Sequence, residues 1–230
     1  MARHAATPES EKEKRRKWIL LITLLLSFAV MVTSLFFLAK IRGWRVRRND
    51  KTLLTIVNAE TLAPADSAQT LTFIDDTHMV DARCAYELEQ MLADCRAAGH
   101  DPCILAAYRS ESEQRELLNA MTEDYMADGS PLEEARRRAA EEVEQPGHSE
   151  HQLGLAVDIS GNTDETGTQR WLEEHAWEYG FILRYPAGGE GLTGGGCGEN
   201  HFRYVGLDAA KQIRELGITL EEYVSMFYSN

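Results

Sequence analysis

The chain has 230 residues and a formal net charge of −13 at pH 7. This length suits one domain with an appendage, because single domains commonly contain about 100–200 residues. Residues 1–48 hold 11 basic and 3 acidic residues, so the other residues carry a net charge of −21. We expect no nucleic-acid partner, because phosphate contacts need clustered Lys and Arg side chains.

The first candidate element is an apolar run at Trp18–Ala39 that contains no charged residue. About 20 apolar residues span the hydrocarbon core of a bilayer, whereas the apolar core of a cleaved signal peptide has roughly 7–15 residues. We therefore predict a single transmembrane anchor at 18–39, with a cytoplasmic tail at 1–17 and a basic linker at 40–51. Basic residues flank the run equally on both sides, so the positive-inside rule does not choose its orientation.

Residues 52–230 read as one α+β domain, because short strands and flanking helices follow one another without regular alternation. Apolar residues at three- and four-residue spacing predict a helix over 81–98 that stops at Gly99. The pattern predicts strands at Leu53–Val57, Leu71–Ile74, Cys103–Ala107, Leu155–Ile159 and Phe181–Arg184, and another that starts at His201. It predicts further helices at Ser112–Met126, 131–144, 168–179, Asp208–Leu216 and Thr219–Phe227. Capping boxes are expected at Ser130 and Thr219.

A candidate metal site lies around His151 and Asp158, which are seven positions apart with Gly154 between them. A neutral imidazole and a carboxylate suit zinc, which binds His nitrogen and Asp oxygen at about 2.0–2.2 Å. A catalytic zinc site needs a third protein ligand and one open position. His201 opens another strand-like run, so we predict one Zn²⁺ held by His151, Asp158 and His201.

Four ordered segments resemble the VanY-type D-alanyl-D-alanine carboxypeptidases and related L,D-carboxypeptidases. Ser149, His151, Gly154, Ala156 and Asp158 match the family pattern Ser-x-His-x-x-Gly-x-Ala-x-Asp. The segments 107–114, 179–186 and 201–206 also resemble family segments. The resemblance covers roughly residues 52–207, most of the chain that follows the apolar run.

The resemblance implies a central, mainly antiparallel sheet that is flanked by helices and bears a zinc cleft. It also implies a monomeric enzyme that acts on peptidoglycan stem peptides. Because a cell-wall enzyme lies outside the cytoplasm, it places the catalytic domain on the extracytoplasmic side of the cell membrane. We expect D,D-carboxypeptidase action, in which a zinc-activated water removes a terminal D-alanine. Two alternatives stay open: L,D-carboxypeptidase action on tetrapeptide stems, and an inactive wall-binding or regulatory module.

Glu199 is the predicted general base, because attack by water needs a carboxylate within hydrogen-bond reach. Its position departs from the family pattern Glu-x-x-His. The acid lies two residues before His201 instead of three, and Gly198 holds the expected place. On a regular strand, residues two apart share a face, so Glu199 could still reach the metal. This shift is the feature that keeps the inactive module as an alternative.

Arg109 is the predicted binding residue for the free carboxylate at the end of the substrate. A guanidinium binds a carboxylate through two parallel hydrogen bonds, which suits recognition of a C-terminus. We expect Ser110, Gln114 and Ser149 to add neutral hydrogen bonds to the substrate.

The four cysteines all lie in the predicted external domain, where an even count suggests disulfides. Cys84 and Cys95 share a predicted helix and are eleven residues apart, about 16 Å along its axis, which is too far for a bond. We predict the pairs Cys95–Cys103 and Cys84–Cys197. The crossed pairing and four free thiols remain alternatives.

Overall fold

The computed structural model describes residues 50–65, 67, 70–185 and 200–228, together with Lys12, Trp18, Ile22, Thr23 and Ser27. The chain divides into two units, Met1–Asn49 and Asp50–Asn230. The predicted anchor at 18–39 lies almost entirely outside the described residues. Within the described part of the chain, none of the helices has both the length and the apolar composition needed to cross a bilayer.

A four-stranded antiparallel sheet forms the centre of the second unit. Its strands are β3 (Pro102–Ala106), β4 (Ala156–Gly161), β5 (Phe181–Leu183) and β6 (His201–Tyr204), in the order β3-β4-β6-β5. Every neighbouring pair is antiparallel, which confirms the predicted type of sheet. A separate two-stranded ribbon joins β1 (Leu71–Phe73) to β2 (Met79–Asp81).

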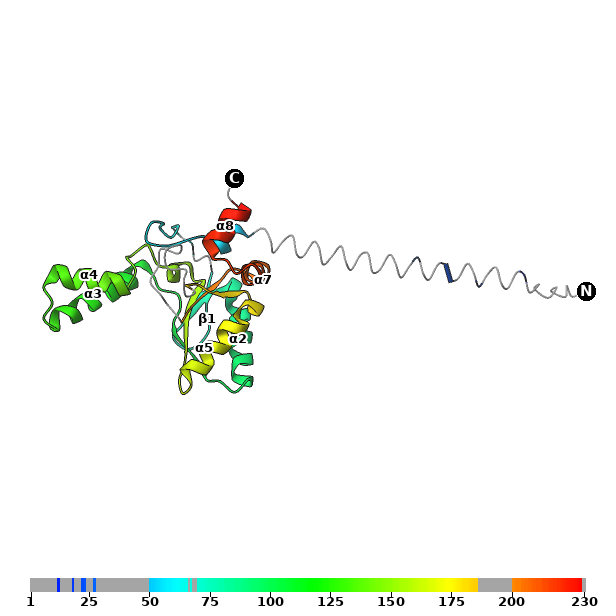
Figure 1. The fold of residues 1–230 in the computed structure, drawn as a ribbon, viewed down its shortest axis with the longest axis horizontal. Coiled ribbons are helices and arrows are strands. Elements are labelled where there is room, and N and C mark those ends of the chain that lie inside the picture. The colour runs from blue at the N-terminus through cyan, green and yellow to red at the C-terminus, as the bar shows by residue number, and fades with distance from the viewer. Residues whose placement is uncertain are drawn as a thin grey trace, which may run out of the picture. The chain divides into compact units, whose positions relative to one another are not determined.

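Helices α2 (Ala82–Ala97) and α5 (Glu165–His175) contribute to the main core on one face of the sheet (Figure 1). Because side chains alternate between the two faces of a strand, Val157, Ile159 and Phe202 all point into this core. They pack with buried side chains of α2 and α5, such as Leu88 and Leu172. The alternate residues of β4 and β6 therefore project from the opposite face of the sheet.

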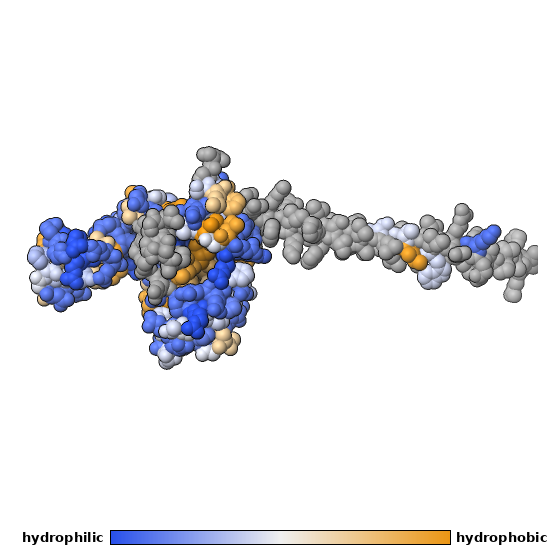
Figure 2. All heavy atoms as spheres, in the orientation of Figure 1, coloured by the Kyte–Doolittle hydropathy of each residue, from blue (hydrophilic) through white to orange (hydrophobic). Residues whose placement is uncertain are grey.

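A second apolar cluster joins the end of the chain to strand β5. Helices α7 (Leu207–Leu216) and α8 (Leu220–Tyr228) pack around Ile182 and Val205. The predicted capping box before α8 is confirmed, because the Glu222 N–H donates to Thr219 Oγ1 and the Thr219 N–H donates to Glu222. Figure 2 shows apolar side chains gathered over α8, where Met226 and Phe227 are exposed.

Helices α3 (Glu111–Ala127) and α4 (Leu132–Glu142) lie side by side as a hairpin that projects from the sheet (Figure 1). Its surface is mainly hydrophilic (Figure 2). The capping box expected at Ser130 is absent: α4 is preceded by Pro131 without a side-chain cap, and Ser130 Oγ accepts from Arg138 instead.

One expected feature near the start of the domain differs from the structure. Lys51–Leu54 forms a 3-10 helix, η1, where the sequence predicts the start of a strand. The side chain of Asp50 accepts a hydrogen bond from the Thr52 N–H, which stabilises a turn rather than an extended backbone. Two further 3-10 helices, η2 (Glu150–Leu153) and η3 (Ala176–Tyr179), precede strands β4 and β5.

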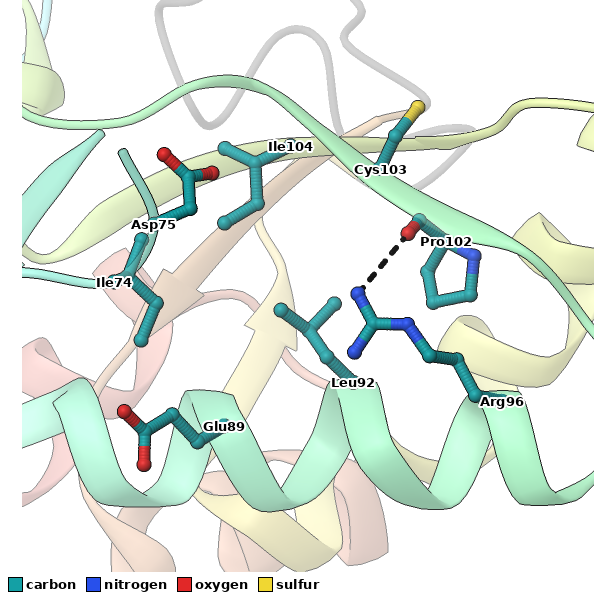
Figure 3. A pocket seen from close by; sticks show the side chains of 8 residues that line it. All are labelled: Ile74, Asp75, Glu89, Leu92, Arg96, Pro102, Cys103 and Ile104. Atoms are coloured by element: carbon teal, nitrogen blue, oxygen red, sulfur yellow. Dashed lines mark hydrogen bonds between the residues drawn. The ribbon is translucent and has the colours of Figure 1, made fainter. Parts of the chain in front are cut away.

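The predicted bridge between Cys95 and Cys103 is wrong, because both residues are free thiols in the structure. Cys95 is buried on α2, whereas Figure 3 shows the Cys103 sulfur directed away from α2, while Pro102 and Ile104 point toward it. The alternation of side chains along β3 thus sends Cys103 to the wrong face of the strand. Cys84 is also a free thiol, and its predicted partner Cys197 lies outside the described residues.

Candidate metal centre

Two of the predicted metal ligands face each other across neighbouring strands. The register of β4 and β6 pairs Asp158 directly with His201. Their neighbours Val157, Ile159 and Phe202 point into the apolar core, so Asp158 and His201 project from the opposite face of the sheet. The strands therefore place a carboxylate beside an imidazole on a rigid surface.

The third predicted ligand, His151, comes from η2, which turns into β4 at Gly154. Gly154 has φ 68°, and an added Cβ would come within 3.0 Å of the Asp81 backbone nitrogen. The position thus favours glycine both by its backbone conformation and by its space. His151 Nδ1 lies 2.7 Å from the carbonyl oxygen of Ala107. Its N–H donates to that carbonyl, so Nε2 is the ring nitrogen directed at the other candidate ligands.

The three side chains converge into one cluster whose candidate ligand atoms all lie within 4.8 Å of one another. His151 Nε2 lies 3.3 Å from Asp158 Oδ2, and His201 Nδ1 lies 2.8 Å from Asp158 Oδ1. Two ligands of a tetrahedral zinc ion are separated by roughly 3.4 Å. Two imidazoles and one carboxylate are also a donor set that suits zinc, so these residues fit a zinc ion.

Electrostatics among the three side chains favour an ionised carboxylate and a charged imidazole. Burial opposes ionisation of Asp158, but hydrogen bonds from His151 and His201 outweigh it and hold the pKa of Asp158 well below its usual range. Burial likewise opposes the charge on His201, yet its hydrogen bonds to Asp158 and Glu150 raise its pKa to about 9. The cluster therefore has the charge balance expected of a site that exchanges a proton for a cation.

A group of buried charged residues lies behind His201, and no local sequence pattern shows that its members meet there. Glu150 accepts a hydrogen bond from Arg184 Nε at 2.8 Å and lies 2.9 Å from Arg203 Nη1. Its second oxygen lies 3.4 Å from His201 Nε2. Tyr185 stacks on the His201 ring, with 5.3 Å between the ring centroids. The only sequence signal was the presence of charged residues next to ligands and within apolar strands.

The structure places Arg109 against the backbone of His151, and Gln114 behind Arg109. The Arg109 N–H donates to the backbone oxygen of His151 at 3.3 Å. Arg109 Nη1 donates to Gln114 Oε1 at 2.7 Å, and the Gln114 amide donates to the Glu144 carbonyl at 2.7 Å. Gln114 is fully buried behind Arg109, so it orients the guanidinium.

The two predicted serines differ in how their hydroxyl groups are used. Ser110 caps α3: its backbone and side chain both bond to the Glu113 carboxylate, at 2.7 and 2.6 Å. Ser149, which immediately precedes η2, is buried, and its Oγ has no partner among the described residues. A buried hydroxyl without a partner is uncommon, so Ser149 is the better candidate for a ligand contact.

The predicted general base cannot be placed in the same way, because Glu199 lies outside the described residues. The described chain resumes at Asn200, whose carbonyl accepts from the Ile159 N–H at 3.0 Å. The residue after the predicted base is thus fixed at the start of β6, one position before His201.

A separate groove of about 430 Å³ lies between α2 and β3 (Figure 3). It is lined by Leu92, Arg96 and Ile104 among others, and therefore opens on the face of the sheet that the helices cover. Arg96 reaches across it toward the Pro102 carbonyl, at 3.5 Å. The groove contains none of the three clustered ligands.

Comparison with known proteins supports the assignment of the cluster. A family model described as VanY, D-alanyl-D-alanine carboxypeptidase, matches residues 77–207. A D-alanyl-D-alanine carboxypeptidase from Enterococcus faecalis is 36% identical over 175 residues, which cover 75% of this chain and 65% of that protein. The chain therefore spans slightly less than two thirds of that relative.

Solved structures give the same picture. A mutant of the vancomycin resistance D,D-pentapeptidase VanY from the VanB-type resistance cassette, in complex with Zn(II), is 35% identical with a TM-score of 0.69. The match covers 75% of this chain and 99% of that one. The LdcB LD-carboxypeptidase is 29% identical with a TM-score of 0.62, over 75% of this chain and 86% of that one.

Proposed function

Because the chain belongs to the VanY family of D-alanyl-D-alanine carboxypeptidases, we propose that it is a zinc carboxypeptidase that removes the terminal D-alanine of peptidoglycan stem peptides. The observation that carries this proposal is the convergence of His151, Asp158 and His201 within 4.8 Å on the face of the sheet opposite the main core. Its support from outside the chain is the activity for which the E. faecalis relative is named, together with the zinc in the similar solved structure.

In this proposal the three clustered residues hold one zinc ion. When bound, zinc supplies a Lewis acid that activates a water molecule and polarises the amide carbonyl. The protein contributes the orientation of the ligands: the Ala107 carbonyl directs His151, and the β4–β6 register directs Asp158 and His201.

Arg109 binds the free carboxylate of the substrate in this scheme. Among the described residues its guanidinium donates to Gln114, and the side chain is partly exposed. Its remaining donors can meet a carboxylate in the two-bond geometry that arginine favours. The buried Ser149 hydroxyl, which lies two residues before His151, is the neutral donor that we assign to the same substrate.

Glu199 remains our proposed general base. The alternative carboxylate, Glu150, is unsuited to that task because it is buried and lies against both Arg184 and Arg203. Burial favours its protonated form, but these two arginines outweigh it and hold the pKa of Glu150 well below its usual range. A carboxylate held ionised in this way is a weak proton acceptor.

The proposal is tested by the purified full-length protein, with zinc content and D-alanine release measured on a synthetic pentapeptide. We expect about one zinc per chain, and Glu199→Gln should retain zinc while turnover falls by roughly 10²–10⁴-fold. Zinc without any turnover in the parent protein would support the inactive wall-binding module instead. Near-normal turnover of Glu199→Gln would remove Glu199 from the role of base.

L,D-carboxypeptidase action is the second candidate function, and the likeness to the LdcB structure favours keeping it. The two activities differ in substrate, so pentapeptide and tetrapeptide stems should be compared at equal concentration. Preferential release of D-alanine from the tetrapeptide would replace the D,D assignment and leave the zinc site untouched.

We also propose that residues 18–39 anchor the protein in the cell membrane, with residues 52–230 outside the cytoplasm as a monomer. The support is the charge-free apolar run and the extracytoplasmic location of peptidoglycan. Protease added to intact spheroplasts should remove the domain. Protection of the domain until the membrane is lysed would contradict this orientation.

A further inference from the structure

Four charged side chains form a continuous series from the three candidate metal ligands to helix α8. Glu150 bonds to Arg184, and Arg184 Nη1 donates to Glu221 Oε2 on α8 at 3.1 Å. Arg203 completes the group and also donates to the Leu53 and Thr55 carbonyls at 3.1 Å. Three of the four, Glu150, Arg184 and Arg203, are at most 2% exposed. Buried charges are costly, so their retention beside a metal cluster requires a reason.

The position of Glu150 relative to the His201 ring gives that reason. Asp158 lies at Nδ1 of the ring, and Glu150 Oε2 lies at Nε2, the nitrogen on its other side. A neutral imidazole carries its proton on one nitrogen and a lone pair on the other. The charged ring carries a proton on both nitrogens. The carboxylate at Nε2 favours retention of the proton there, so loss of the other proton leaves the Nδ1 lone pair facing Asp158 and His151.

We propose that Glu150 is a positioning residue that holds His201 in its Nε2-protonated tautomer, so that Nδ1 bonds zinc, and that Arg184 ties this arrangement to α8 through Glu221. The proposal rests on the zinc site of the proposed function, but not on the peptidase activity. It distinguishes the two histidine ligands: His151 bonds the metal through Nε2 because Ala107 takes its Nδ1 proton, and His201 uses the opposite nitrogen.

The two arginines fix the place of Glu150 as well as its charge. Arg184 directly follows β5 and Arg203 belongs to β6, and both contact the same oxygen of Glu150, Oε1. This leaves Oε2 directed at His201. Glu221 occupies the outer guanidinium nitrogens of Arg184, so α8 contributes to where Arg184, and hence Glu150, lies.

The first test measures zinc affinity by chelator competition in the full-length protein, without substrate. Glu150→Gln should raise the zinc dissociation constant about 10–100-fold, the usual effect of losing a hydrogen-bond partner of a metal ligand. Glu221→Gln should have a smaller effect in the same direction. Glu215→Gln, whose exposed side chain lies beside Lys211 on α7, is the matched control and should leave zinc affinity unchanged.

A second pair of variants separates positioning from simple charge balance. Glu150→Gln with Arg184→Gln removes one buried charge of each sign, so its melting temperature should lie closer to that of the parent than that of Glu150→Gln alone. Its zinc affinity should stay weak. Recovery of zinc affinity together with stability would overturn the proposal, because Glu150 would then act only as a counter-charge.

If Glu150→Gln does not fold, Glu150→Asp retains the charge and withdraws the oxygen from His201 by one methylene. The folded variant should again bind zinc more weakly. A direct readout is the tautomer of each histidine in the zinc-loaded parent, from ¹⁵N NMR of the imidazole rings. We expect a proton on Nε2 of His201 and on Nδ1 of His151. A proton on Nδ1 of zinc-bound His201 would overturn the proposal even if peptidase activity is intact, whereas lack of activity alone would not.

Discussion

One face of the four-stranded sheet packs Val157 and Phe202 against helices, whereas the other face holds Asp158, His201 and Arg203. The same two strands supply both sets, because consecutive side chains point to opposite faces. The apolar face is stabilised by burial of apolar surface area, so its contribution to stability is not expected to depend on pH or metal. The charged face depends on pairing between charged groups whose burial is costly, so its stability should depend on both pH and metal.

The largest expected effect follows from removal of a ligand on the charged face. His151→Ala should lose most bound zinc and reduce D-alanine release below detection, because it deletes one of three donors. His148→Ala is the matched control, since His148 bonds the Asn58 carbonyl and is not part of the cluster. Metal analysis and turnover measure both variants, and full zinc occupancy in His151→Ala would remove this residue from the site.

The apolar face should respond through stability. Phe202 lies between His201 and Arg203 in the sequence, but its side chain is fully buried on the apolar face. Phe202→Ala should lower the free energy of unfolding by about 3–5 kcal/mol. Zinc-saturated protein should show a similar loss, because the cavity forms on the side away from the ligands. Chemical denaturation of the zinc-loaded protein measures it. A loss of zinc affinity without loss of stability would show that the two faces are not separable.

Without metal, the charged face should make stability depend on pH. The pKa of His201 is raised to about 9 from a model-peptide value of 6.5, so its contribution is complete below pH 6.5 and is lost as pH rises through 9. The loss is on the order of 3 kcal/mol. Zinc must displace a proton from this cluster, so the stabilisation by zinc should grow over the same window.

Melting temperatures with chelator and with zinc, from pH 6 to pH 10, test this dependence. His175→Gln changes a partly exposed histidine on α5 and should leave the profile as it is. A chelated protein whose stability is constant from pH 6.5 to 9 would contradict the charge assigned to His201.

The smallest of these effects concerns the substrate rather than the cluster. Arg109→Lys should lower kcat/KM by roughly 10–100-fold, because an ammonium group cannot reproduce two parallel hydrogen bonds to a carboxylate. Arg115→Lys, on the exposed face of α3, is the control. Zinc content should not change in either variant. Amidation of the peptide's C-terminus removes the same interaction from the substrate side. The parent protein should therefore cleave the amidated peptide no faster than Arg109→Lys cleaves the free acid.

The residues that could be predicted from sequence are those whose role follows from local spacing and chemistry. His151, Asp158 and His201 lie in matching motif contexts, and the structure brings them together. The order of the sheet strands could not be obtained from pattern, because it depends on which distant segments pair.

The same limit explains what was missed and what was wrong. Glu150 meets Arg184 and His201 across 34 and 51 residues of chain, so no local pattern shows that it lies between them. Cys95 and Cys103 are near in sequence, which favoured a bridge, but the period of the strand turns Cys103 away from the helix. Both cases depend on the direction of a side chain rather than on proximity along the chain.

The pairing of Asp158 with His201 has a consequence for how the protein folds. A slip of one residue between β4 and β6 would turn every side chain of one strand to the other face, and would carry His201 into the apolar core. A slipped chain therefore lacks the complete donor set, and only the correct register can gain the free energy of zinc binding. Zinc in the growth medium should then increase the fraction of chains that fold with the correct register of β4 and β6.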